Sequence, residues 1–170
     1  MDKAEVSNGS WLEYMQDRMN EPDFDSSHIK QLYPRMDIWK KSYPTDFSDL
    51  GFYENYPVVA VSFPQVLDYC KWRSNKISAK RKSKIVYKLP NFEHFYLAAN
   101  QNSDSPAADL YSTKFDHRRN FIGICDNAAE MTDIEGLAVN GFFGDDCLDS
   151  LRYRNYDQRL GFRCIAYFNK

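Results

Sequence analysis

The sequence is poor in the residues that build common metal centres. It has three histidines, which lie far apart, and four cysteines, which form no C-x-x-C pair. The spacing typical of zinc sites is therefore absent. The histidines are His28, His94 and His117, and the cysteines are Cys70, Cys125, Cys147 and Cys164. We interpret each histidine as an isolated surface or capping residue.

The chain also lacks an excess of charge and a long apolar run. Its 22 basic and 24 acidic residues give a net charge of −2, so we expect neither nucleic acid nor a membrane surface as the main partner. No run approaches the roughly 18–20 apolar residues of a spanning helix, and we expect no membrane span. Residues 1–5 lack the apolar core of a signal peptide. The compartment stays open: periplasmic or cell-surface if a signal peptide has been removed, and cytoplasmic otherwise.

Aromatic residues, by contrast, are abundant. They make up 16% of the chain, and hydrophobic residues as a whole account for 43%. Large rings bury much area per residue, which suits a loop-rich fold and argues against disorder. A length of 170 residues is within the usual range of one domain. We expect a single domain over residues 1–170 with a real hydrophobic core.

Local signals predict helices near residues 8–18, 63–76 and 91–99. The first follows the good cap residues Ser7 and Asn8, and the third follows Asn91. The second follows Ser62, with Gln65 three residues later as in a capping box. Short apolar runs predict strands over residues 57–61, 85–87 and 161–168. Helices beside short strands and much loop indicate an α+β fold.

Two segments between these elements have competing interpretations. Residues 21–56 are rich in Pro, Asp and Ser, which suits a linker or a packed loop. We favour the packed loop because linkers seldom carry so many aromatic residues. These are Tyr33, Trp39, Tyr43, Phe47 and Phe52. The basic residues between 76 and 84 are interpreted as a solvated loop rather than an anion-binding patch.

Several blocks, in order, resemble one known family. They are EVSN (residues 5–8), PVVAVSF (57–63) with YCKW (69–72), LPN (89–91) with Phe95 and Ala98-Ala99, DNAAEMT (126–132) and GFRC (161–164). Together they resemble the formylglycine-generating-enzyme (sulfatase-modifying-factor) family. The resemblance implies a variant of the C-type-lectin fold, with short strands, two to three helices and long loops.

The resemblance also implies a chemistry that this chain lacks the residues to perform. Family enzymes oxidise a substrate cysteine with a pair of active-site cysteines that hold copper. The matching segment, residues 145–154, contains Cys147 alone, among acidic residues that disfavour its thiolate. We therefore lean towards a non-enzyme and expect no copper. Another branch uses an iron held by an H-x-H motif, which this sequence lacks.

Asp126, Ala128 and Glu130 match the positions where family members bind structural calcium, an ion that takes six to eight oxygen ligands. The alternative is that Glu130 only caps backbone amides, and both interpretations stay open. Arg163 is interpreted as a structural residue whose five donors satisfy loop carbonyls.

Cys70 and Cys164 match a disulfide pair of secreted family members. We expect the two residues to be neighbours, and oxidation to depend on the compartment. We predict no disulfide for Cys125 or Cys147.

The resemblance is greatest to gliding-motility and type IX secretion lipoproteins of Bacteroidota, which use the fold structurally. The leading hypothesis is a non-catalytic binding or scaffold domain, with another protein as its partner. The recognition surface is predicted within residues 140–159, in which Phe142, Phe143, Arg152, Tyr153, Arg154 and Tyr156 are of types enriched at interaction hot spots. The competing interpretation is that at least half of these aromatics belong to the core. Alternatives are a divergent copper-dependent oxidase and a ligand-displaying variable protein of a diversity-generating retroelement.

Overall fold

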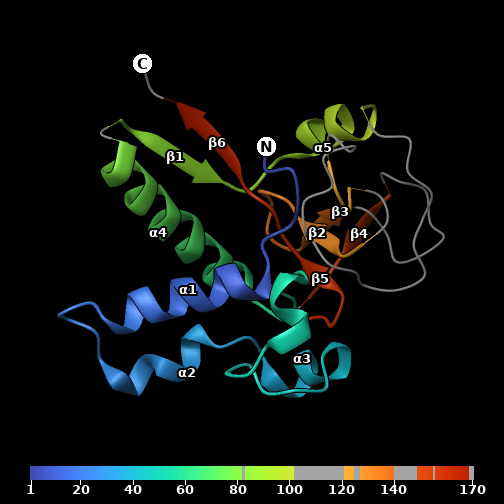
Figure 1. Cartoon of the computed structure of the whole chain (residues 1–170). Helices are drawn as coiled ribbons and strands as arrows, with labels where there is room; N and C mark the ends of the chain where they lie inside the picture. Colours follow the sequence, from blue (N-terminus) through green and yellow to red (C-terminus); the bar gives the residue numbers. More distant parts are fainter. Residues whose placement is uncertain (82, 102–120, 125–126, 140–148, 155, 169–170) are drawn as a thin grey trace.

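The computed structural model describes residues 1–81, 83–101, 121–124, 127–139, 149–154 and 156–168. The helices are α1 (Asn8–Met19), α2 (Ile29–Leu32), α3 (Met36–Ser42), α4 (Phe63–Arg81) and α5 (Phe92–Ala99), with 3₁₀ turns η1 (Ser26–His28) and η2 (Gly51–Asn55). The strands are β1 (Ile85–Lys88), β2 (Ala129–Met131), β3 (Leu137–Val139), β4 (Ser150–Arg152), β5 (Leu160–Gly161) and β6 (Ile165–Phe168). Figure 1 shows α1, α2 and α3 together at one end of the molecule, α4 beside β1, and α5 apart from them near β3. The predicted α+β class is confirmed.

The three predicted helices are present as α1, α4 and α5, and each begins at its predicted cap. Ser62 and Gln65 form the capping box, because the Ser62 N–H donates to Gln65 Oε1 at 2.7 Å and the Gln65 N–H to Ser62 Oγ at 3.4 Å. Asn91 and His94 cap each other in the same way at the start of α5. Helix α4 runs to Arg81, so the part of the basic run up to that residue is helical rather than loop.

Residues 21–56 are packed against the body of the protein, as predicted, but part of the segment is helical. Trp39, Tyr43 and Phe47 are almost fully buried. The Trp39 indole N–H donates to the Asn8 side chain at 3.1 Å, and the Tyr43 hydroxyl donates to the Pro57 carbonyl at 2.7 Å. Phe52 was expected to pin the segment, and instead its side chain is 77% exposed.

The strand predicted over residues 57–61 is absent. The segment is buried and apolar, yet its backbone forms hydrogen bonds with loops instead of with a neighbouring strand. The Val58 N–H donates to the Val6 carbonyl, and the Ala60 N–H donates to the Asp157 carbonyl. Ala60 has a φ of 59°, a left-handed conformation that interrupts any strand. Burial and hydrophobicity were predicted correctly, and the regular structure was not.

The described strands form two sheets. The order β4-β3-β2-β5 gives a sheet in which only β2 and β5 run parallel, and β1 pairs with β6 in a separate antiparallel sheet. The single closing strand predicted over residues 161–168 is thus divided between the two sheets. Residues 162–164 lie between its two parts, and all three are buried.

Aromatic rings fill the region where α1, α4 and the closing segment meet. Trp11 stacks on Tyr69 with ring centroids 5.5 Å apart, and Phe162 meets both rings edge-on. Aromatic pairs in these arrangements stabilise a fold by more than the burial of their apolar surface alone. Among the described residues, no helix combines the length and apolar character that a membrane crossing requires.

Candidate functional site

A buried ion pair joins the closing segment to β2. Arg163 lies between β5 and β6, and its Nε and Nη2 atoms donate to the two carboxylate oxygens of Glu130 at 2.6 and 2.5 Å. Both side chains are fully buried. Paired contacts of this kind are among the strongest side-chain hydrogen bonds. Arg163 and Glu130 therefore fix the position of the central strand relative to the end of the chain.

The remaining donors of Arg163 satisfy carbonyls of distant loops, as predicted. Nη2 donates to the Ile122 carbonyl at 2.9 Å, and Nη1 donates to the carbonyls of Asp2 and Lys3 at 3.4 and 3.3 Å. One side chain thus holds the N-terminal segment, the loop around residue 122 and β2 together. This is the structural role expected for the arginine.

Glu5 is a second buried carboxyl group beside Arg163. Its Oε2 lies 3.7 Å from Arg163 Nη2, and neither of its oxygens has a hydrogen-bond partner among the described residues. Gly123 gives it room: a Cβ at this position, where φ is 69°, would lie 2.3 Å from Glu5 Oε1. Burial raises the pKa of Glu5 to about 8. When Glu5 carries a proton it is neutral, and the negative charge of Glu130 then balances the positive charge of Arg163.

Nothing in the sequence indicated this role for Glu5. Its only signal was a place in the EVSN block, next to the start of α1. The burial of Glu5 depends on residues more than a hundred positions away, so no local pattern could have revealed it.

Two of the three predicted calcium ligands, Ala128 and Glu130, lie within the described residues. Asp126 lies outside the described residues, and Ala128 is buried. Both carboxylate oxygens of Glu130 accept hydrogen bonds from Arg163. A calcium ion needs many oxygens and is repelled by a nearby guanidinium. Within the described ranges no three His, Cys, Asp or Glu side chains are grouped closely enough to hold a metal ion. The pairing of Glu130 with Arg163 is unfavourable for a calcium ligand, and calcium binding stays a prediction that thermal melting of metal-stripped protein with added calcium would test.

Cys70 and Cys164 lie side by side in the core. Their Sγ atoms are 3.7 Å apart, and both are buried free thiols. Burial, together with the neighbouring Cys70, raises the pKa of the Cys164 thiol. The expected proximity of the two residues agrees with this distance, and the disulfide itself stays a prediction.

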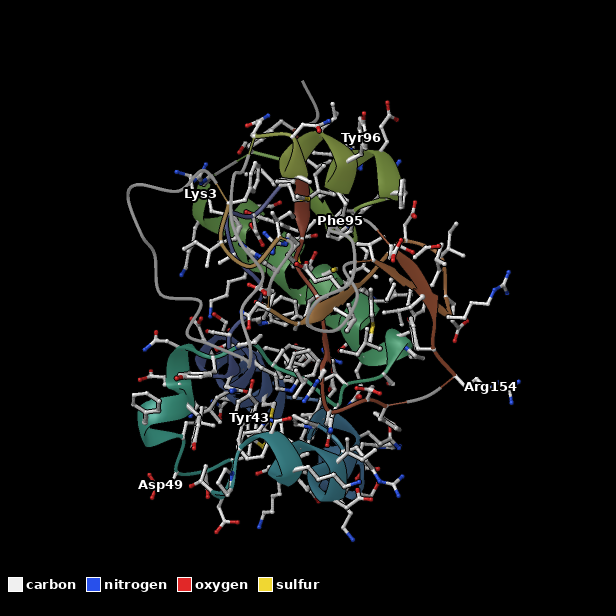
Figure 2. All side chains as sticks on the ribbon, turned by 90° about the vertical axis from the view of Figure 1, so that its right-hand side faces the viewer. Lys3, Tyr43, Asp49, Phe95, Tyr96 and Arg154 are labelled. Atoms are coloured by element: carbon white, nitrogen blue, oxygen red, sulfur yellow. The ribbon has the colours of Figure 1, made fainter. Side chains whose placement is uncertain are left out.

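The described residues of the predicted recognition surface have different surroundings. Phe142, Phe143 and Cys147 lie outside the described residues. Arg152 and Arg154 are exposed, and Figure 2 shows Arg154 reaching away from the body of the protein. Tyr153 packs against the main core. Of the four described residues, Tyr156 lines a cavity.

That cavity is a groove of about 1170 Å³ between the end of α1, the segment 21–37 and the start of α4. It was not predicted, because its two walls are far apart in the sequence. The capping box of α4 positions one wall: Gln65 Nε2 donates to the carbonyls of Gln31 and Tyr33 at 2.7 and 2.8 Å. Leu32 and Pro34 are buried on the other wall, and the rings of Phe24, Tyr33 and Tyr156 lie along it.

Charged side chains of the groove are held by one another. Arg18 lies 2.5 Å from Glu21 and 3.3 Å from Asp68, which accepts a hydrogen bond from the Tyr14 hydroxyl at 2.6 Å. Arg35 donates to Asp37 at 2.7 Å and lowers the pKa of that carboxyl. The Arg35 guanidinium also lies 5.9 Å from the centre of the Tyr156 ring. The groove thus presents oriented charges and rings, and we find no nucleophile–base pair among its residues.

The chain was also compared with known proteins. No curated protein matches it. The family model of the sulfatase-modifying factor enzyme 1-like domain matches residues 1–129. The matched range includes α1, α4, α5 and the groove segment 21–37, and it ends before Cys147 and Arg163. The chain therefore belongs to the sulfatase-modifying factor enzyme 1-like family.

Proposed function

We propose that this chain is a non-catalytic member of its family that binds another protein. The observation that carries the proposal is the groove between α1, segment 21–37 and α4, with its rings and paired charges. Aromatic and arginine side chains are enriched at protein interfaces, and buried aromatic anchors dominate binding energy. Tyr156, from the predicted recognition segment, lines this groove.

The lone cysteine of residues 145–154 supports the absence of catalysis. Copper in an open site needs two soft thiolate ligands, and this segment supplies one. We further propose that the domain serves as a component of a protein assembly, such as a gliding-motility or type IX secretion machinery. The support for this part is the sequence resemblance alone.

Site-specific crosslinking tests the groove. A photo-crosslinking residue at Phe24 should form an adduct with the partner in cells that express the chain, and one at Phe52 should not. Phe52 is the matched control, because it is a highly exposed phenylalanine that does not line the groove. Equal adducts from both positions would contradict a groove-specific partner.

Substitutions then measure the contribution of each groove residue. Arg35→Ala and Tyr156→Ala should each weaken partner binding by about tenfold or more, as hot-spot truncations do. Phe52→Ala should leave it unchanged. If Arg154→Ala abolished binding while the groove variants did not, the exposed segment rather than the groove would be the binding surface. Mass-spectrometric identification of the adduct tests the assembly: a partner outside such machinery would contradict that part alone.

A further inference from the structure

The β1–β6 sheet has one edge that the fold closes and one that it leaves open. The register pairs Ile85 with Phe168, Val86 with Tyr167, Tyr87 with Ala166 and Lys88 with Ile165. Helix α4 lies along β1 on the side away from β6 (Figure 1). A two-stranded sheet of this length is marginal by itself, so its stability depends on what covers it.

Two serines of α4 close the outer edge of β1. Ser78 Oγ accepts from the Ile85 N–H at 2.9 Å and donates to the Ile85 carbonyl at 3.0 Å. Ser74 Oγ accepts from the Tyr87 N–H at 2.8 Å. The backbone groups of Ile85 and Tyr87 therefore point away from β6. It follows that their partners Phe168 and Ala166 form non-hydrogen-bonded pairs with β1.

By the same alternation, Ala166 and Phe168 turn their own N–H and C=O groups to the outer edge of β6. In the part of the chain that the structure describes, these groups make no hydrogen bond. Among the described residues, the N-terminal segment meets this edge before β6 begins, where the Asp2 N–H donates to the Cys164 carbonyl at 2.7 Å. An open edge of this kind is a template for another strand.

The described side chains at this edge are aromatic, and the neighbouring strand β1 is flanked by cations. Tyr167 and Phe168 are 40% and 67% exposed. Lys88 is the last residue of β1 and Lys84 directly precedes that strand; both are exposed, and within the described ranges neither is in an ion pair. The Lys88 ammonium lies 5.6 Å from the Tyr167 ring. A second copy of this edge would bring two sets of these cations together, whereas an acidic strand would be attracted.

We propose that the open edge of β6 binds an extended, acidic segment of another protein, which adds to the β1–β6 sheet as a third strand. Backbone groups of Ala166 and Phe168 bond the segment, and Lys84 and Lys88 pair with its carboxylates. The aromatic side chains of β6 contact its apolar residues. This is strand addition at a sheet edge, a recurrent mode of peptide recognition. The edge shares no residue with the groove, so the two proposals can fail separately.

Synthetic peptides test the proposal directly. The probe is a peptide of alternating Glu and Val, with a peptide of alternating Lys and Val as its charge-reversed control. The Glu peptide should bind at least about tenfold more tightly, and Lys84→Glu with Lys88→Glu should remove that preference. Equal binding of the two peptides, or none, would overturn the proposal.

Backbone substitutions test the strand geometry. Two versions of the Glu peptide are compared, one N-methylated at its odd-numbered residues and one at its even-numbered residues. One version should bind at least about tenfold more weakly than the unmodified peptide, and the other should bind equally well. Ala166→Pro removes the outward N–H without removing a bond to β1, and should have the same effect. If that variant does not fold, the comparison of the two methylated peptides on the original protein still tests strand addition. Equal weakening by both methylation patterns would overturn it.

Hydrogen exchange of the free protein supplies the remaining outcomes. The Ala166 and Phe168 amides should exchange fast without peptide and slow with it, and the protein should stay monomeric. Protection of both amides in the free monomer would show that the edge is already closed. Protection that rises with protein concentration would show a second copy on the edge. Either result would overturn the proposal.

Discussion

Glu5, buried beside Glu130 and Arg163, shows how one residue can make the stability of the fold depend on pH. The pKa of Glu5 is raised by burial from 4.5 to about 8. In the unfolded chain the same carboxyl group loses its proton near its ordinary value. Between these two pKa values the folded state retains a proton that the unfolded state has released, so the free energy of unfolding falls as the pH rises.

Glu5→Gln should remove this dependence. In the original protein the free energy of unfolding should fall by up to about 1.4 kcal/mol per pH unit from about pH 5 to about pH 8. The variant stays neutral at every pH and should be the more stable protein at the upper end. Urea unfolding across this range measures both slopes. Glu13→Gln is the control, because Glu13 is exposed and pairs with Lys76; an unchanged slope in Glu5→Gln would contradict the assignment.

Ala60 provides a second prediction at the scale of one residue. Its left-handed φ of 59° costs an alanine roughly 1–2 kcal/mol, and a glycine almost nothing. The lost buried methyl costs about 0.8 kcal/mol and the freer unfolded chain roughly 0.4–1 kcal/mol. These costs offset most of the relieved strain, so Ala60→Gly should change the free energy of unfolding by less than about 1 kcal/mol. Ala138→Gly, at a buried strand position without this strain, should destabilise the protein by about 1–2 kcal/mol. Thermal melts of both variants compare the two losses, and an Ala60→Gly variant that is destabilised as much as Ala138→Gly would contradict the strain at position 60.

At the scale of elements, α4 organises three of its neighbours. Its capping box forms one wall of the groove, Ser74 and Ser78 close the edge of β1, and Cys70 contacts Cys164 just before β6. The first of these contacts was visible in the sequence as a local motif. The serines were not, since a serine within a helix usually faces solvent or its own backbone.

The contact between Cys70 and Cys164 predicts a redox-dependent stability. In an oxidising buffer the two thiols should form a disulfide that links residues 94 positions apart. The chain-entropy model gives such a bridge about 4–5 kcal/mol, although measured bridges often contribute less. The raised pKa of the Cys164 thiol makes formation slow at neutral pH. Peptide mapping without reductant and thermal melting test this, with Cys70→Ala as control; a protein that stays fully reduced would contradict it.

At the scale of the whole molecule, membership of the family does not by itself establish the family's chemistry in this chain. The chain belongs to the family, and the segment expected to hold the copper ligands contains only Cys147. We expect no oxidation of a cysteine-containing sulfatase-type peptide, with or without added copper, because one thiol cannot provide the open two-thiolate site. Product mass and oxygen consumption measure this. Turnover that Cys147→Ser abolishes would restore the enzyme hypothesis.

Local chemistry was sufficient to predict much of this protein. Ser62, Gln65 and Asn91 cap helices because a cap needs only residues three or four positions apart. The aromatic residues of segment 21–56 predicted a packed loop, and Trp39, Tyr43 and Phe47 are buried as expected. The order of the sequence blocks indicated the family. Each of these properties depends on neighbours along the chain or on composition.

Other features depend on contacts between distant segments, and only the tertiary structure decided them. Ala60 adopts a left-handed conformation because loops at Arg35 and Asp157 take its backbone bonds, which no strand pattern could indicate. Glu5 is buried beside Arg163 because a glycine at position 123 leaves room for its carboxyl group. The groove and the open edge of β6 arise where segments 21–37, 62–68, 85–88 and 165–168 are brought together. The sequence by itself determined α1, α4 and α5, many of the core residues and the family, because those follow from short-range spacing and hydrophobicity. The surfaces available for binding follow from long-range packing, which spacing alone does not specify.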